Sequence, residues 1–130
     1  MKIMDLQPEK LWYLASPYSH EYSLIREQRY LDVCRVASRL MRENVHVFSP
    51  IAHTHSIAKM GGLPTGWDFW HRYDKIMLDA CYGMIIVPLK GWAESKGVKG
   101  EIELTVKMKK PIYKLDTGNW ELEPLILQIA

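Results

Sequence analysis

The sequence of 130 residues contains no Gly-x-Gly-x-x-Gly stretch, no Walker-type glycine and lysine motif, and only two cysteines. The missing glycine motifs argue against a dinucleotide-binding fold and a P-loop enzyme, because both use such glycines to bring backbone N–H groups against phosphates. Cys34 and Cys81 lie in apolar periodic segments, and their number and spacing fit neither a disulfide framework nor a metal clip. We expect two buried free thiols in a reducing compartment.

Long apolar runs and strong net charge are lacking as well. The longest apolar run, residues 84–89, is far too short to cross a bilayer, and the first ten residues carry acidic side chains and no apolar core. The formal net charge is only +2, and the basic residues are dispersed, with a modest cluster at 107–110 that is typical of a solvated helix end. We therefore expect a cytoplasmic protein with no membrane or nucleic-acid partner.

Short apolar runs alternate with amphipathic segments along the whole chain. The runs at 11–15, 45–48, 83–89 and 111–115 predict strands, and continuous apolar strands are typical of a parallel sheet that is covered on both faces. Helical spacing predicts helices over about 21–43 and 65–80, and a third helix that begins within 93–101 and ends at about 110. The chain is long enough for one core. We expect one α/β domain over 1–130, with a doubly wound, three-layer, flavodoxin-like or Rossmann-like parallel sheet of four or five strands.

Helix ends and faces can also be predicted. Asn44 should end the first helix, and Thr65 with Asp68 resembles a capping box that begins the second. The core-facing residues of this second helix are predicted to be Phe69, Tyr73, Ile76, Met77 and Ala80.

Two segments have less pattern. Residues 51–66 predict a long loop over the sheet edge, and loops of that length are often lids or binding loops. His53 and His55 have the spacing of a metal pair, but no acidic or cysteine partner stands nearby, so we expect no metal. The apolar tail, residues 120–130, can pack on its own domain or on another subunit, and both readings stay open.

One stretch, residues 93–101, follows the most apolar strand and opens a helix, which places it at the carboxyl edge of the sheet where open α/β folds bind ligands. Gly97 and Gly100 allow close backbone approach, and the free N–H groups of a first helical turn favour negative charge. Glu101 stands at this mouth, although an acidic residue near a helix start also simply complements the dipole. Asp74, beside Arg72 and Lys75, has an equally ordinary reading as a solvated carboxylate.

Three stretches together resemble the nucleoside 2-deoxyribosyltransferase family. They are Tyr-Leu-Ala-Ser at 13–16, Asp74 before the central strand, and Ser95-x-Gly97-Val98-x-x-Glu101 after it; Lys-Lys-Pro-Ile-Tyr at 109–113 matches the usual entry to the last strand. The similarity covers most of residues 11–115, and the motifs most resemble those of the 2′-deoxynucleoside 5′-phosphate N-hydrolases and of small uncharacterised phage and bacterial proteins of this superfamily.

The resemblance implies a role for each matching residue. Glu101 is implied as the nucleophile at C1′ of a deoxyribosyl group, Asp74 as the group that handles protons on the departing base, and Tyr13 as the residue that orients Glu101. Ser95 stands where the transferases have aspartate, and a neutral hydroxyl favours a phosphate. The further candidates for substrate binding are Ser16, Ser19 and Gly97 at the phosphate, and Trp67, Trp70 or Trp92 stacked on the base, with core packing as the alternative for the tryptophans.

The resemblance therefore predicts an N-glycosidase or deoxyribosyltransferase for a (deoxy)nucleoside or its 5′-monophosphate, without a cofactor and assembled as a homo-oligomer. For the pair to work, Glu101 should stay charged near backbone N–H groups while a more apolar pocket raises the pKa of Asp74. Glu94 and Glu103 are rival carboxylates that match the motif spacing less well.

Three other readings stay open. Pro17 and Tyr18 replace the family's glycine-rich or arginine-bearing turn, which leaves room for a non-catalytic nucleotide-binding or sensing module. A structural domain with a vestigial site is a second alternative. A phosphoribohydrolase of the lysine-decarboxylase-like type is a third, although its paired-glycine and threonine signature is missing.

Overall fold

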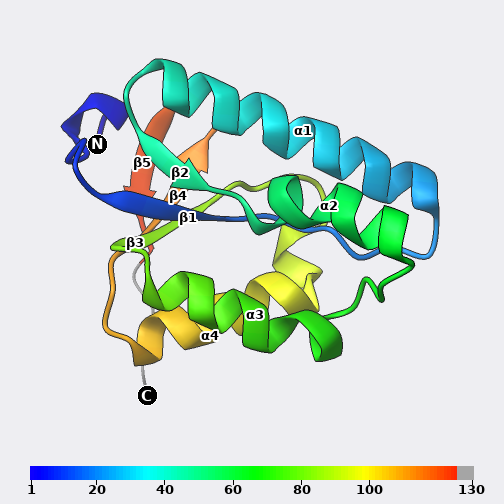
Figure 1. Cartoon of the computed structure of the whole chain (residues 1–130). Coiled ribbons are helices and arrows are strands. Elements are labelled where there is room, and N and C mark those ends of the chain that lie inside the picture. The colour runs from blue at the N-terminus through cyan, green and yellow to red at the C-terminus, as the bar shows by residue number, and fades with distance from the viewer. Residues whose placement is uncertain (126–130) are drawn as a thin grey trace.

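The computed structural model describes residues 1–125 as one α/β domain with a sheet between helices (Figure 1). Its five strands and four α-helices follow in the order β1 (Leu11–Ala15), α1 (Ser23–Arg42), β2 (His46–Phe48), α2 (Pro50–Gly61), α3 (Trp67–Asp79), β3 (Gly83–Ile86), α4 (Lys96–Lys107), β4 (Ile112–Asp116) and β5 (Glu121–Pro124). Two short 3₁₀ helices, η1 (Ile3–Asp5) and η2 (Trp92–Glu94), complete the elements.

The sheet has the strand order β2-β1-β3-β4-β5, with the first four strands parallel and β5 antiparallel to β4. This is the flavodoxin-like order, in which the chain reverses its winding direction between β1 and β3. The predicted three-layer α/β fold is confirmed, and the fifth strand is the one that departs from a parallel arrangement. Ligands of such sheets bind outside the carboxyl ends of the strands at the reversal, here the ends of β1 and β3.

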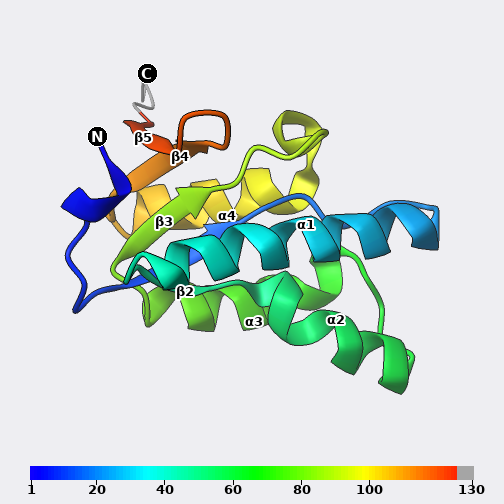
Figure 2. The ribbon, with the colours of Figure 1, turned by 90° about the horizontal axis from the view of Figure 1, so that it is seen from above.

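Side-chain alternation along the central strands divides the core into two halves. Trp12 and Leu14 of β1 pack with α1 and with Ile51 of α2, whereas Tyr13 and Ala15 pack on the opposite side with Leu78 of α3. Figure 1 shows α1 and the α3–α4 pair on opposite sides of the sheet, and Figure 2 gives the view from above. The period of two in a strand therefore directs Tyr13 towards α3 and α4.

The predicted loop over 51–66 is wrong, because most of it forms α2. Ser49 caps the helix by accepting a hydrogen bond from the Ala52 N–H, and Pro50 occupies the first helical position. Gly62 ends it in the left-handed conformation with φ 64°. A serine followed by proline and, twelve residues later, a glycine are ordinary start and stop signals for a helix. The end of α1 is predicted correctly, since Asn44 follows it with φ 65°.

The predicted capping box of α3 is also wrong, and its inner face is predicted only in part, since Met77 packs on the core as expected. Its N-cap is Gly66 and no side chain caps it, so Thr65 and Asp68 form no capping box. The buried residues are Asp74 and Leu78, whereas Phe69 and Ile76 are 47% and 68% exposed. Trp67, Asp74 and Leu78 lie at i, i+7 and i+11 and share one face, which packs on α4. The solvated reading of Asp74 is thereby overturned.

The two ends of the described chain lie together at β5. Residues 121–124 of the apolar tail pair with β4, and the Met1 amino group donates to the Leu122 carbonyl at 2.9 Å. The first part of the tail thus packs on its own domain; residues 126–130 lie outside the described residues. Cys81 is buried, whereas Cys34 is only half-buried, and both are free thiols. Within residues 1–125, no helix is both long enough and apolar enough to cross a membrane.

Lys110 differs from the predicted solvated helix end. Its ammonium donates to the carbonyls of Leu78, Asp79 and Cys81 at 2.7, 3.0 and 2.6 Å. These carbonyls lie at and just beyond the C-terminus of α3, where carbonyl groups lack helical partners and the dipole favours a cation. Lys110 therefore fixes the end of α3 against the entry to β4.

Candidate active site

A cavity of about 530 Å³ opens at the carboxyl ends of β1 and β3, where the sheet topology places ligand sites. Its walls come from the loop after β1, from α2, from the first two turns of α3 and from the start of α4. Asp74 and Glu101 both line it.

Glu101, which lines this cavity, is in contact with Tyr13. Tyr13 is fully buried on β1, Glu101 is 4% exposed on α4, and the Tyr13 hydroxyl donates a hydrogen bond to the Glu101 carboxylate. Burial and the charges of Glu101 and Asp74 raise the Tyr13 pKa well above its usual value, so the phenol keeps its proton and remains a donor. Glu101 lies on the buried face of α4 with Val98 and Thr105. This is the orientation that the resemblance implies.

Asp74 completes the group from α3. Its carboxyl is 8% exposed, and burial raises its pKa to about 7, with the Tyr13 hydroxyl acting in the opposite direction. It lies close enough that its negative charge raises the pKa of Glu101. The raised pKa expected for Asp74 is thus found.

The expectation that backbone N–H groups keep Glu101 charged is wrong. Glu101 is the sixth residue of α4, beyond the first turn, and burial followed by the charge of Asp74 raises its pKa well above the usual value. Only the Tyr13 hydrogen bond acts in the other direction. Two close carboxyls in such surroundings favour sharing one proton near neutral pH, so they titrate as a pair.

The start of α4 also lines the cavity. Ser95 is the N-cap, and its hydroxyl oxygen accepts from the Val98 N–H at 3.2 Å. Ser95, Lys96 and Gly97 all line the cavity. The hydroxyl hydrogen of Ser95 has no acceptor among residues 1–125 and can serve a ligand.

Ser16 and Ser19 lie in the loop that follows β1, and both line the cavity. Ser19 already donates to the Thr65 carbonyl at 2.6 Å. Ser16 is 5% exposed, and within the described part of the chain its hydroxyl has no hydrogen-bond partner. A buried hydroxyl without a partner costs about 1–3 kcal/mol, so this serine is an unused polar group facing a cavity.

The tryptophans divide into two groups. Trp67 and Trp70 line the cavity, and Trp67 lies so close to Gly100 that a Cβ atom there would come within 2.3 Å of the indole ring. Trp92 is not among the lining residues of the described chain; it packs on the core between the sheet and the α3–α4 pair, beneath the Lys114 ammonium. The candidate role of Trp92 in stacking on a base is therefore withdrawn.

Sequence reasoning missed Arg29, which lines the cavity from α1. Its guanidinium donates to the Ser19 carbonyl at 2.8 Å and, across the mouth, to the Lys90 carbonyl at 3.4 Å. It lies against Gly91, where a Cβ atom would come within 2.8 Å of the guanidinium, and the φ of 92° also favours glycine at this position. Arg29 therefore joins the loops after β1 and β3 and adds positive charge to the wall of the cavity. A lone arginine on a helix gives no sequence signal for this role.

The rival carboxylates and the histidine pair are placed elsewhere. Glu94 is exposed at the rim of the cavity, and Glu103 is exposed on the outer side of α4. His53 is exposed between the rings of Phe48 and Tyr73, whereas His55 is buried. Within residues 1–125, no three His, Cys, Asp or Glu side chains are placed to hold a metal ion.

One protein family matches most of the chain, including the residues of this site. The family model described as "Domain of unknown function (DUF1937)" matches residues 10–117, which include every element from β1 to β4. The chain belongs to the DUF1937 family. No curated protein matches it. The matched range of the DUF1937 domain contains Tyr13, Asp74 and Glu101, so the cavity and its carboxyl pair belong to the family domain itself.

Proposed function

We propose that this DUF1937 domain is an N-glycosidase or deoxyribosyltransferase that cleaves the bond between base and sugar in a (deoxy)nucleoside or its 5′-monophosphate. The observation that supports this most is that Asp74 and Glu101, from two different helices, line one cavity, while Tyr13 of β1 donates a hydrogen bond to Glu101. Two carboxyls with one proton between them are the usual means of breaking a glycosidic bond through an oxocarbenium-like state.

The proposed reaction has two steps. A Glu101 carboxylate oxygen forms a bond to C1′ as the N-glycosidic bond breaks, and the electron pair of that bond leaves with the base, which takes a proton from Asp74. Water, or a second base in a transfer reaction, then attacks C1′, gives its proton to Asp74 and releases Glu101. Tyr13 donates to Glu101 and fixes the direction of its carboxylate. Arg29 and the first turn of α4 supply positive potential for a 5′-phosphate, and the hydroxyls of Ser16 and Ser95 supply donors.

Base release tests the proposal directly. The protein is incubated with deoxynucleosides, ribonucleosides and their 5′-monophosphates, and free base is measured by chromatography. We expect release from at least one substrate, its loss in Glu101→Gln, and normal release in Glu103→Gln, which changes an exposed carboxylate two residues away. Release that persists unchanged in Glu101→Gln would falsify the mechanism. Binding of a nucleotide without any release would favour the sensing module instead.

A homo-oligomer also remains a proposal. Phe69 and Ile76 on the outer face of α3 are exposed apolar side chains of the kind that subunit contacts cover. Light scattering coupled to size exclusion gives the mass in solution, and a monomer across the micromolar range contradicts this proposal.

A further inference from the structure

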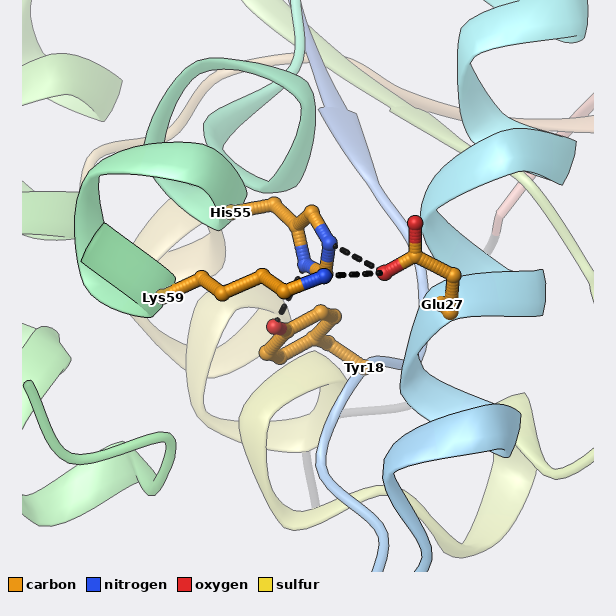
Figure 3. A network of polar contacts seen from close by, with 4 residues as sticks. All are labelled: Tyr18, Glu27, His55 and Lys59. Carbon is orange, nitrogen blue, oxygen red and sulfur yellow. Dashed lines mark hydrogen bonds and ion pairs between the residues drawn. The ribbon is translucent and has the colours of Figure 1, made fainter. Parts of the chain in front are cut away.

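A second polar network forms the α2 side of the cavity, away from Tyr13, Asp74 and Glu101. Tyr18, in the loop after β1, and His55, on α2, both line the cavity, while Glu27 reaches the histidine from α1 (Figure 3). His55 Nδ1 lies 2.7 Å from the Tyr18 hydroxyl oxygen, and Nε2 lies 2.7 Å from Glu27 Oε2. The Tyr30 ring stacks on the imidazole with centroids 4.1 Å apart. Both ring nitrogens are thus engaged, and the ring is fixed in place.

The partners of His55 determine which nitrogen carries the hydrogen. An ionised carboxylate only accepts hydrogen bonds, so Nε2 must be the N–H that donates to Glu27. In a neutral imidazole Nδ1 then has a lone pair, and the Tyr18 hydroxyl must donate to it. The Lys59 ammonium, 3.8 Å from the same Glu27 oxygen, adds positive charge on the outer side of this pair (Figure 3).

The hydrogen bonds of His55 determine how the Tyr18 hydroxyl can bind a ligand. Because its hydroxyl hydrogen is committed to His55, the phenol oxygen can offer only lone pairs to the cavity. Burial raises the Tyr18 pKa, and Arg26 opposes this through its charge and as a nearby donor. Within residues 1–125, the Arg26 guanidinium makes its hydrogen bond to the His20 carbonyl, and no Arg26–Tyr18 pair has hydrogen-bond geometry. The oxygen is therefore an acceptor with a fixed direction in the wall of the cavity.

The geometry points to Tyr18 as a specificity-determining residue that accepts a hydrogen bond from an O–H or N–H donor of the ligand, with His55 and Glu27 as positioning residues. A site built around a polar partner discriminates strongly against a ligand that lacks the matching group, because the buried acceptor is then left unpaired. This inference rests on the proposed function, since the ligand in question is the nucleoside or nucleotide that the same cavity would cleave.

The test uses matched pairs of nucleoside 5′-monophosphates that differ by one donor. The pairs are adenine and unsubstituted purine, the 2′-hydroxyl and 2′-deoxy sugars, and the 3′-hydroxyl and 3′-deoxy sugars. In the wild-type protein we expect kcat/KM to differ by about tenfold or more within one pair. Tyr18→Phe should reduce that ratio to below about threefold and leave the other ratios unchanged. Tyr22→Phe, the same chemical change at an exposed tyrosine of the same loop, should keep every ratio.

Two His55 variants test the positioning role. His55→Leu removes the acceptor for the Tyr18 hydroxyl and should lower the same ratio, whereas His55→Asn, whose amide oxygen can take the place of Nδ1, should restore most of it. The nitrogen NMR shifts of His55 in the wild-type protein give a readout that needs no variant to fold. We expect the hydrogen on Nε2 and a lone pair on Nδ1.

The outcomes distinguish a failure of the role of Tyr18 from a failure of the proposed function. If the wild-type protein cleaves a pair with discrimination and Tyr18→Phe keeps all ratios, or slows both members of every pair equally, the inference is overturned and the proposed function stands. A hydrogen on Nδ1 of His55 in the wild type also overturns it. If the wild type cleaves no member of any pair, the proposed function fails for nucleotides and this inference fails with it.

Discussion

The hydroxyl of Tyr13, the third residue of β1, donates to the carboxylate of Glu101 on α4, 88 residues further along the chain. The pleat of β1 directs Tyr13 to the side of α3 and α4, and the burial of Val98 and Thr105 turns Glu101 towards the sheet. Tyr13 is fully buried, and Glu101 retains only 4% exposure, on the side that lines the cavity. The contact is therefore a product of the whole topology, because it needs β1 and β3 to be neighbours and α4 to follow β3.

Removal of the Tyr13 hydroxyl should lower activity without unfolding the protein. In Tyr13→Phe the ring still fills its place in the core, but the Glu101 carboxylate loses its donor, and the loss of a hydrogen bond to a buried charged group costs about 1.5–3 kcal/mol. We expect kcat for base release to fall about 10- to 100-fold, with an unchanged far-ultraviolet circular dichroism spectrum. An unaltered kcat would show that Tyr13 does not orient Glu101.

The pH dependence of stability should report the buried carboxyl pair. The pKa of Asp74 is about 7 in the folded protein, against an ordinary value near 3.8, so the folded state binds more protons than the unfolded state between these values. Stability from this group is then fully present below about pH 4 and is lost as pH rises to about 7, by up to about 1.4 kcal/mol per pH unit. Asp74→Asn removes this dependence.

Urea unfolding at several pH values between 4 and 8 measures the effect. The difference in unfolding free energy between Asp74→Asn and the wild type should shift in favour of the variant as pH rises. Asp79→Asn, which changes an exposed carboxyl on the same helix, is the control and should show no such trend. A constant difference for Asp74→Asn across this range contradicts the raised pKa.

Much of this fold could be predicted because its strands are continuous apolar runs. Residues 83–89 predict a central strand, and the structure places β3 between β1 and β4. The spacing from Ser95 to Glu101 then places a helix start and a buried carboxylate at one sheet edge. The prediction of Asp74, Tyr13 and Glu101 as one group came from the resemblance, since only tertiary packing brings α3 beside β1.

The errors have a common physical cause. Hydrophobicity alone predicts the inner face of α3, but α3 buries Asp74 and leaves Ile76 exposed, because the inner face of α3 also lines the cavity, and Asp74 is one of the lining residues. α2 was missed although Ser49, Pro50 and Gly62 mark both ends, since the residues between them show little apolar periodicity. Without α2, the partnership of His55 with Tyr18 could not be anticipated.

Gly100 should be essential for the close packing of α3 on α4. A Cβ atom at this position would lie 2.3 Å from the Trp67 ring, so Gly100→Ala must displace the indole and the first turn of α3. Overpacking of this kind costs about 1–3 kcal/mol. Gly97→Ala is a matched control in the same helix, because its Cβ would meet only ordinary contacts at 3.8 Å or more, and helix propensity favours alanine there. Urea unfolding should rank Gly97→Ala above the wild type and Gly100→Ala below it. Equal stabilities for the two variants would contradict the packing.

Lys110 should stabilise the domain far more than its exposed neighbour Lys107. Lys110→Met leaves the carbonyls of Leu78, Asp79 and Cys81 without their ammonium donor. A hydrogen bond that involves a charged group contributes about 1.5–3 kcal/mol, and in the variant water can replace part of this by hydrogen-bonding to the carbonyls. We expect a loss of about 2 kcal/mol in unfolding free energy. Lys107→Met, at the exposed last residue of α4, should change it by less than about 0.5 kcal/mol. A loss of similar size in both variants would mean that the Lys110 contacts contribute nothing specific.

Ser16→Ala should weaken ligand binding without lowering the stability of the protein. Its buried hydroxyl has no partner within residues 1–125, so Ser16→Ala removes an unpaired polar atom. The ligand-free protein should then be as stable as the wild type or more stable by up to about 1 kcal/mol.

If the Ser16 hydroxyl donates to the ligand, the same variant should bind a nucleoside 5′-monophosphate about tenfold more weakly, because one hydrogen bond is lost. Calorimetry in a Glu101→Gln background measures the affinity without turnover, and thermal unfolding without nucleotide measures the stability. Ser38→Ala, on the exposed side of α1, should change neither quantity. A Ser16→Ala protein that is less stable and binds as tightly as before would show that this serine supports the loop after β1 and does not bind the ligand.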